Sequence, residues 1–188
     1  MKRIPGRTRQ RMVDSAVTLL RERGASGVSI DAVLAHSGAP RGSVYHHFPG
    51  GRNELVLSAV RQAGNHIGRQ INRRPTVGEP HVVLDGFVDY WRRTLTDSGY
   101  RSGCPVVALA VDNRGELPEA ADAVREIFWA WQEKLRELLI EAGLPTERSK
   151  RLAKVAVAAV EGAVVLCRAE RSTEPLDVVI EELAPLFQ

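Results

Sequence analysis

Cysteines and long apolar runs are scarce in this sequence of 188 residues, and each shortage excludes a class of protein. The two cysteines, Cys104 and Cys167, lie far apart and outside any CxxC or Cys/His cluster, which argues against a disulfide framework and a structural zinc site. No stretch is apolar for long enough to span a bilayer, and the basic, polar residues after Met1 do not form a signal peptide. We therefore expect a cytoplasmic protein that uses no metal or cofactor and has no membrane partner.

The sequence also lacks the patterns that common enzymes and β-sheets require. It contains no phosphate-binding loop, no metal-ligand spacing and no evident pairing of a nucleophile with a base. His46 and His47 are adjacent, so on a helix they point apart and cannot chelate one metal ion together. The clear periodic segments are all helical, and none alternates as a strand does. We expect an all-α protein that is not an enzyme; an all-helical enzyme assembled from distant residues is the open alternative.

Residues 29–55 are the most informative stretch, because two short helical patterns there flank a turn. The first pattern begins at a capping residue, Ser29, and stops at Gly38. The second begins near Pro40, buries one apolar face and ends after Phe48 at a Pro-Gly-Gly sequence. This arrangement fits a helix-turn-helix motif, whose second helix enters the DNA major groove, and it fits an ordinary helical hairpin equally well.

The segment APRGSVYHHFPGGRNEL, residues 39–55, resembles the recognition segment of the TetR family of transcriptional regulators. The later Gly-Cys-Pro at 103–105 resembles a subset of that family, the LmrA/YxaF-like regulators. The resemblance implies an all-α fold with an N-terminal three-helix helix-turn-helix DNA-binding domain, followed by a larger helical ligand-binding and dimerisation domain. We place the DNA-binding domain at residues 1–51, a connecting helix at 52–74 and the effector-binding and dimerisation domain at 75–188.

The charge distribution favours the DNA-binding interpretation of the first segment. Residues 1–52 hold nine Lys and Arg against three Asp and Glu, a formal charge of +6, whereas residues 53–188 carry −3. A basic surface neutralises phosphates and supplies affinity that does not depend on base sequence. A merely solvated charged face is the alternative, but the excess coincides with the recognition motif.

Several side chains of this motif can bind DNA. Arg41 begins the recognition helix, and its guanidinium can bind guanine O6 and N7 together. By resemblance, Gly42 allows close approach and Tyr45 contacts DNA, while Ser29 and Arg52 lie at helix N-termini, which favour phosphate. The predicted DNA-binding residues are Ser29, Arg41, Gly42, Ser43, Tyr45, His46, His47 and Arg52.

The resemblance also implies an effector cavity in the second half, where most aromatic residues are found. The candidate pocket residues are Phe87, Tyr90, Trp91, Cys104, Val107, Phe128 and Trp131. An aromatic stripe of this kind is also typical of plain core, and both roles can hold at once. Cys104 precedes a helix that could lower the pKa of its thiol, so a redox-sensing cysteine is the alternative to a structural one.

The predicted helix over 146–170 is too apolar on all sides for the surface of a monomer. Its small residues allow another helix to approach closely, and the last helix adds a further apolar stripe. We expect these two helices to pair with their copies in a homodimer, with a buried core helix as the alternative. The candidate interface residues are Val155, Ala159, Gly162, Ala163, Leu166, Val179 and Leu183.

These observations together predict a dimeric, ligand-responsive transcriptional regulator. We expect a repressor that binds a palindromic double-stranded DNA operator and is released by a small-molecule effector of unknown identity. A regulator of the same kind that responds to oxidation of Cys104 is the first alternative, and an all-helical enzyme is the second.

Overall fold

A computed structural model of the chain describes residues 5–71, 80–112 and 118–187, and all the regular elements within these ranges are helices. The contacts divide the chain into two units. Unit 1 comprises residues 1–64 and 104–125, and unit 2 comprises residues 65–103 and 126–188. The division falls within two helices, α4 (Gly51–Gly68) and α7 (Pro118–Glu141), so each contributes residues to both units.

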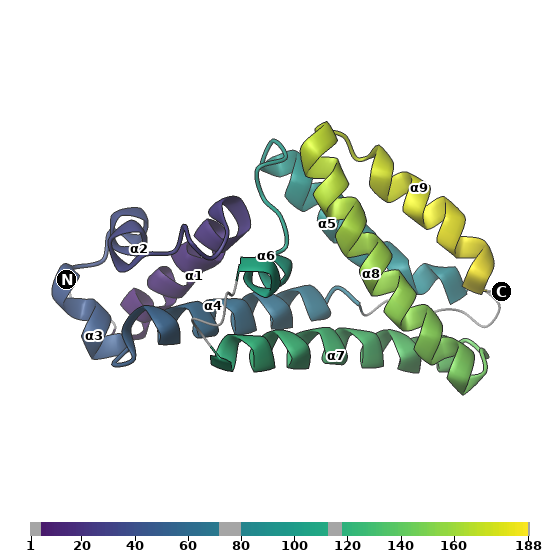
Figure 1. The fold of residues 1–188 in the computed structure, drawn as a ribbon, viewed down its shortest axis with the longest axis horizontal. Coiled ribbons are helices and arrows are strands. Elements are labelled where there is room, and N and C mark those ends of the chain that lie inside the picture. Colours follow the sequence, from purple (N-terminus) through teal and green to yellow (C-terminus); the bar gives the residue numbers. More distant parts are fainter. Residues whose placement is uncertain (1–4, 72–79, 113–117, 188) are drawn as a thin grey trace. The chain divides into compact units, whose positions relative to one another are not determined.

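Unit 1 begins with the helices that the sequence predicts. They are α1 (Pro5–Arg23), α2 (Ile30–Ser37), the short 3-10 helix η1 (Arg41–Ser43) and α3 (Val44–His47). The three α-helices are labelled in Figure 1. The apolar faces of α1 to α4 bury a common core that includes Met12, Leu20, Val28, Val33, Val44, Phe48 and Val56. The three-helix head with its helix-turn-helix is therefore present.

Local chemistry explains the bounds of α2. The Ser29 hydroxyl accepts a hydrogen bond from the Ala32 N–H at 3.1 Å, which satisfies one of the free donors of the first turn. Gly38 ends the helix with a φ of +63°, and its N–H donates to the Leu34 carbonyl. This left-handed conformation favours glycine, because a Cβ would be strained there.

The recognition segment differs from the single helix that the sequence predicts after Pro40. Its first turn is the 3-10 helix η1, and only Val44–His47 is α-helical. The Ser43 N–H and hydroxyl both bond to the Pro40 carbonyl, at 2.9 and 2.6 Å, which closes a tight i to i+3 turn. Gly42 has low helical propensity and adds to this preference.

Unit 1 also contains the start of α4, the first part of α7 and α6 (Pro105–Asp112). Helix α6 packs beside α1. The Asp112 carboxylate, at the end of α6, accepts a hydrogen bond from the Ala25 N–H at 2.9 Å. The sequence gives no sign of this contact, because the two residues are 87 positions apart.

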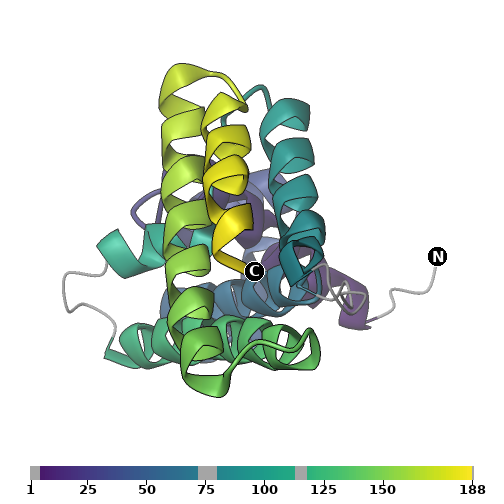
Figure 2. The same cartoon turned by 90° about the vertical axis from the view of Figure 1, so that its right-hand side faces the viewer.

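Unit 2 holds the remaining helices. They are η2 (Pro80–Leu84), α5 (Asp85–Asp97), α8 (Thr146–Glu170), α9 (Glu174–Leu183) and η3 (Ala184–Phe187), together with the ends of α4 and α7. Figure 2 shows α9 running alongside α8. Gly68 of α4 lets the Trp131 ring of α7 pack closely, since a Cβ there would lie 3.0 Å from the indole nitrogen.

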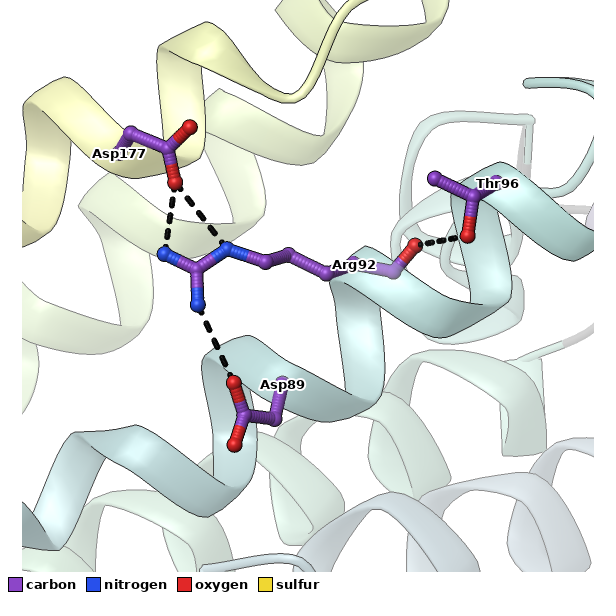
Figure 3. A network of polar contacts seen from close by, with 4 residues as sticks. All are labelled: Asp89, Arg92, Thr96 and Asp177. Carbon is purple, nitrogen blue, oxygen red and sulfur yellow. Dashed lines mark hydrogen bonds and ion pairs between the residues drawn. The ribbon is translucent and has the colours of Figure 1, made fainter.

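An ion-pair network joins α5 to α9 (Figure 3). Arg92 of α5 donates from Nε and Nη2 to one oxygen of Asp177 on α9, at 3.0 and 2.6 Å, and from Nη1 to Asp89 at 3.1 Å. The pKa of Arg92 is raised: burial alone would lower it, but the hydrogen bonds and charges of the two carboxylates outweigh burial. Arg92 is therefore a permanent cation between two helices.

The fold class predicted from the sequence is confirmed, and the predicted helices match the observed ones closely. The predicted domain ranges 1–51, 52–74 and 75–188 stay a prediction, and the boundary at 74/75 lies outside the described residues. The contact-based units group α6 and the start of α7 with the N-terminal helices, although the sequence division assigned them to the larger domain.

Candidate nucleic-acid interface

The η1 and α3 segment presents polar side chains to solvent while Val44 and Phe48 anchor it from below. Arg41, Gly42, Tyr45 and His46 are exposed, and Ser43 and His47 are half-buried. Tyr45 is 65% exposed, which is unusual because most aromatic residues of folded proteins are largely buried. Six of the predicted DNA-binding residues therefore share one short element.

Arg41 is the most accessible cation of this element. Its guanidinium lies 3.5 Å from the Asp31 carboxylate of α2, and the two side chains are 88% and 81% exposed. An ion pair so open to water is worth about 1 kcal/mol or less, because solvent screens it. Arg41 can therefore exchange Asp31 for a phosphate or a guanine edge at little cost.

Gly42 and Tyr45 shape the surface beside Arg41. A Cβ built on Gly42 would meet no atom within 4 Å, so the protein's own packing does not require a glycine there. The Tyr45 ring packs near Gly51, at 3.6 Å from the position a Cβ would take. The rings of His46 and His47 meet edge to face, with centroids 4.9 Å apart. The exposed hydrogen-bond donors of Arg41, Tyr45 and His46 therefore lie close in the chain to Gly42, which has no side chain to cover its backbone.

Arg52 makes contacts that the sequence does not reveal. Its Nε donates to the Val28 carbonyl and its Nη2 to the Ala25 carbonyl, both at 2.7 Å, and the residue is half-buried. The guanidinium therefore bridges two carbonyls of the turn between α1 and α2 through charge-assisted hydrogen bonds. The predicted phosphate contact of Arg52 stays a prediction.

Ser29 lies at the far end of that turn, exposed at the start of α2. Its hydroxyl is committed to the Ala32 N–H as a cap, while the adjacent N–H groups of the first turn face outward from a helix N-terminus. A helix N-terminus favours a phosphate oxygen. The predicted phosphate contact at Ser29 is compatible with this geometry and stays a prediction.

The predicted effector residues fall in both units. Phe87, Tyr90, Trp91 and Trp131 are buried in unit 2, and Phe128 is half-buried there. Their rings meet edge to face, with centroids 5.0 to 6.4 Å apart. The buried Trp91 Nε1 has no hydrogen-bond partner among the described residues. Val107 is half-buried in unit 1.

Both cysteines are free and buried. Cys104 belongs to unit 1 and is 6% exposed, whereas Cys167 belongs to unit 2 and is fully covered. Burial raises the pKa of the Cys167 thiol, and the charges of Glu170 and Asp177 raise it further. Both thiols are covered in this structure, and the alternative of a redox-sensing Cys104 stays a prediction.

The predicted interface residues divide between two faces of the last helices. Val155, Gly162 and Leu166 are exposed, and Ala159 and Val179 are half-buried. Ala163 and Leu183 are instead buried inside unit 2. One face of the helix over 146–170 thus packs within the chain and the opposite face carries exposed apolar residues, while the predicted dimer interface stays a prediction.

Sequence reasoning missed three polar contacts that the fold creates. They are the Asp112 contact to Ala25, the Arg92 network and a contact at Gly103, where the Arg168 guanidinium crosses the glycine and donates to the Arg101 carbonyl at 3.0 Å. A Cβ on Gly103 would lie 2.8 Å from Arg168 Nη1, so an alanine at this position of the Gly-Cys-Pro motif would displace the end of the Arg168 side chain. Helical spacing can reveal the Asp89–Arg92 pair, but the other partners are distant in sequence.

Within residues 5–71, 80–112 and 118–187, no group of three His, Cys, Asp or Glu side chains is placed to hold a metal ion. None of the helices described there has both the length and the apolar character needed to cross a membrane.

Comparison with known proteins identifies the two halves separately. Residues 12–59 match "Bacterial regulatory proteins, tetR family", and residues 80–182 match "Transcriptional regulator LmrA/YxaF-like, C-terminal domain". An uncharacterized HTH-type transcriptional regulator of Mycobacterium tuberculosis H37Rv is 39% identical over 95% of this chain and 93% of its own length.

More distant relatives agree. The HTH-type transcriptional regulator LmrA of Bacillus subtilis is 26% identical over 91% of this chain and 92% of its own length. The regulatory protein TetR from Rhodobacter sphaeroides superposes with a TM-score of 0.83 at 24% identity, covering 94% of this chain and 97% of the other. At that identity the likeness establishes the fold.

Proposed function

The chain belongs to the TetR family of DNA-binding transcriptional regulators, with an LmrA/YxaF-like C-terminal domain, and from this premise we propose that it is a homodimeric repressor released from a palindromic operator by a small-molecule effector. Its relatives and fold neighbours are regulators rather than enzymes. Because the target is chromosomal DNA, we expect the protein to work in the cytoplasm.

The observation that carries the proposal is the open polar surface of η1 and α3. Arg41 is solvent-exposed, Gly42 has empty space around it, and Tyr45 is exposed beside them. A groove-binding helix needs this combination: donors for base edges and phosphates, with a backbone that base pairs can approach closely. The N-cap at Ser29 and the stop at Gly38 hold the supporting helix rigid.

The outer face of α8 and α9 supports the homodimer. Val155, Val165, Leu166 and Val178 are each about half exposed, at 47%, 54%, 52% and 49%. The α8 members recur at helical spacing around Gly162, so they form one apolar stripe. A stripe of this kind on the surface of a monomer is costly in water, and a second copy of the chain would cover it.

The aromatic cluster of unit 2 supports a small-molecule effector. The rings of Phe87 and Tyr90 contact the Trp91 indole within α5, and Phe87 also contacts the Trp131 ring of α7. The buried Trp91 N–H lacks a partner among the described residues. A buried donor without an acceptor costs about 1 to 3 kcal/mol, and a bound molecule with an acceptor atom would remove that cost. We therefore expect an effector that is largely apolar and carries a hydrogen-bond acceptor.

The test is a binding titration by fluorescence anisotropy with duplexes from the DNA that flanks the chain's own coding region. We expect tight, salt-dependent binding to a duplex with two half-sites, against a scrambled duplex of equal length. Replacing Arg41 by Ala should weaken binding of the preferred duplex by about 1 to 3 kcal/mol and binding of the scrambled duplex much less, because a base contact is lost. If the parent protein prefers no duplex at moderate salt, the proposal is wrong.

A further inference from the structure

The turn between α1 and α2, residues 24–28, is held from two sides by side chains of opposite charge. The Asp112 carboxylate of α6 accepts the Ala25 N–H at 2.9 Å. Arg52 of α4 donates to the Ala25 carbonyl and to the Val28 carbonyl, both at 2.7 Å. The two polar groups of one residue, Ala25, are therefore each bound to a charged side chain from a different helix.

The packing around this turn leaves room for the Asp112 carboxylate only because residue 24 is a glycine. Gly24 has a φ of +72°, and a Cβ there would collide with the Asp112 carboxylate. A glycine is thus required both for the backbone conformation and for the approach of Asp112. Ala25 and Val28 are buried, so a shift of the turn would disturb the core beneath it.

The turn leads directly into the predicted DNA contact. Ser29, the cap of α2, follows Val28 immediately, and the helix-turn-helix begins there. The position of the α2 N-terminus is therefore set by two anchors, one on α4 and one on α6. Of these, Asp112 lies outside the sequence range of the helix-turn-helix.

We propose that Asp112 is a positioning residue for operator binding, which holds the α1–α2 turn and so places the N-terminus of α2 against a phosphate. Any event that draws the end of α6 away from Ala25 would then weaken operator binding by breaking this one hydrogen bond. The inference rests on the proposed operator binding and adds to it one residue of α6 that positions the DNA-binding surface.

The negative charge of Asp112 lets a binding experiment distinguish a positioning role from an electrostatic one. Asp112 is negative, so removing its charge by itself can only strengthen or leave unchanged the attraction to DNA. A positioning role predicts instead that operator binding becomes weaker in a variant whose residue 112 cannot accept a hydrogen bond. Asp112→Asn keeps an oxygen acceptor without charge, whereas Asp112→Ala keeps neither.

The experiment measures the dissociation constant of the operator duplex for the parent, D112N and D112A at several salt concentrations. We expect D112N to bind as tightly as the parent or more tightly, and D112A to bind about threefold to tenfold more weakly, as loss of one hydrogen bond predicts. The salt dependence of D112A should also be shallower, because a phosphate contact is lost. Asp122→Ala, an exposed carboxylate of unit 1 that pairs with Arg125, is the matched control and should bind like the parent.

A second perturbation tests the same contact without removing Asp112. A Cβ at Gly24 would collide with the Asp112 carboxylate, so Gly24→Ala should weaken operator binding as D112A does, whereas Gly38→Ala, with a similar positive φ and no atom within 4 Å of its Cβ, tests backbone strain without that collision. If D112A binds the operator as tightly as D112N, or Gly24→Ala binds no more weakly than Gly38→Ala, the positioning role is wrong while operator binding stands. If the parent binds no duplex, the proposed function itself fails.

Discussion

Gly42 is the residue for which the fold gives the least reason and DNA binding gives the most. Nothing lies within 4 Å of a Cβ built there, and its φ is not in the left-handed region. We expect Gly42→Ala to melt at the same temperature as the parent or slightly higher, because alanine orders the chain more readily. Its affinity for the operator should fall by about tenfold or more, since a base pair or phosphate would meet the new methyl group.

Gly38→Ala is the matched control for that substitution. Gly38 is equally uncrowded but has a φ of +63°, so alanine there should cost about 1 kcal/mol of stability through backbone strain. Thermal unfolding and operator titrations of both variants separate the two causes. Parent-like binding by Gly42→Ala would show that DNA does not approach this position.

Cys167 should make stability depend on pH in the alkaline range. Burial raises the pKa of its thiol above the ordinary value of 9.0, so the unfolded chain loses this proton at a lower pH than the folded chain. The stability that the buried neutral thiol contributes is fully present below the unfolded pKa and is lost as pH rises from there through the raised folded pKa. Urea unfolding at pH 7.5 and pH 10 (about 1.5 units below and 1 unit above that value) should show the parent losing more stability than Cys167→Ala. Equal losses in both proteins would contradict a buried, neutral thiol.

At the scale of elements, the Arg92 network predicts that the stability of α9 against local unfolding depends on its contacts with α5. Arg92→Ala leaves Asp89 and Asp177 without their shared cation, and we expect a loss of about 1 kcal/mol in the free energy of unfolding. Amide exchange should accelerate in α9 more than in α8, because the lost contact anchors α9. In 1 M salt the difference from the parent should shrink, since screening weakens the pair.

Arg125→Ala provides the comparison for a pair that joins no two elements. Arg125 binds Asp122 at 3.0 Å within α7, and both side chains are largely exposed. We expect its stability to change by less than about 0.5 kcal/mol. An equal effect of the two substitutions would mean that the Arg92 network does not secure α9.

The recognition segment shows how an element can be found from the sequence while its form is not. Capping and breaker residues located it correctly between Gly38 and Pro49. The hydrogen bonds of Ser43 to the Pro40 carbonyl then made its first turn a 3-10 helix. Helix propensity does not distinguish a 3-10 helix from an α-helix well, because the two differ only in whether each N–H bonds to the carbonyl three or four residues earlier.

At the scale of the whole molecule, the outer face of α8 predicts that folding and pairing can be separated. Gly162 lies in the middle of a 25-residue helix and is exposed, and no atom lies within 4 Å of a Cβ built on it. Glycine there costs about 1 kcal/mol of helix stability, and nothing described within the chain explains it. The proposed homodimer would explain it through the close approach of a second α8.

Gly162→Leu should therefore keep the helical circular dichroism of the parent and sediment as a monomer at micromolar concentration. A large side chain would separate the two helices and prevent their close packing. Operator binding should fall with dimerisation, because one half-site alone binds weakly. Ala121→Leu, an exposed small-to-large change on α7, should remain dimeric. A dimeric Gly162→Leu would place the interface elsewhere.

The sequence by itself determined the helical class, the bounds of the helix before the turn and of the helix over 146–170, and the position of the recognition segment. These depend on local chemistry: apolar spacing, capping residues and glycine or proline breakers act over a few positions. It also placed the exposed cation Arg41 correctly at the start of that segment, because surface side chains need few partners.

Only the tertiary structure decided which polar groups meet. It turned Arg52 inward onto Ala25 and Val28, brought Asp112 to the same turn, and buried Ala163 and Leu183 while leaving Val155 and Leu166 open. The physical reason is that such contacts join residues far apart in sequence. Their partners are chosen by how the helices pack and by the need of buried carbonyl and N–H groups for hydrogen bonds.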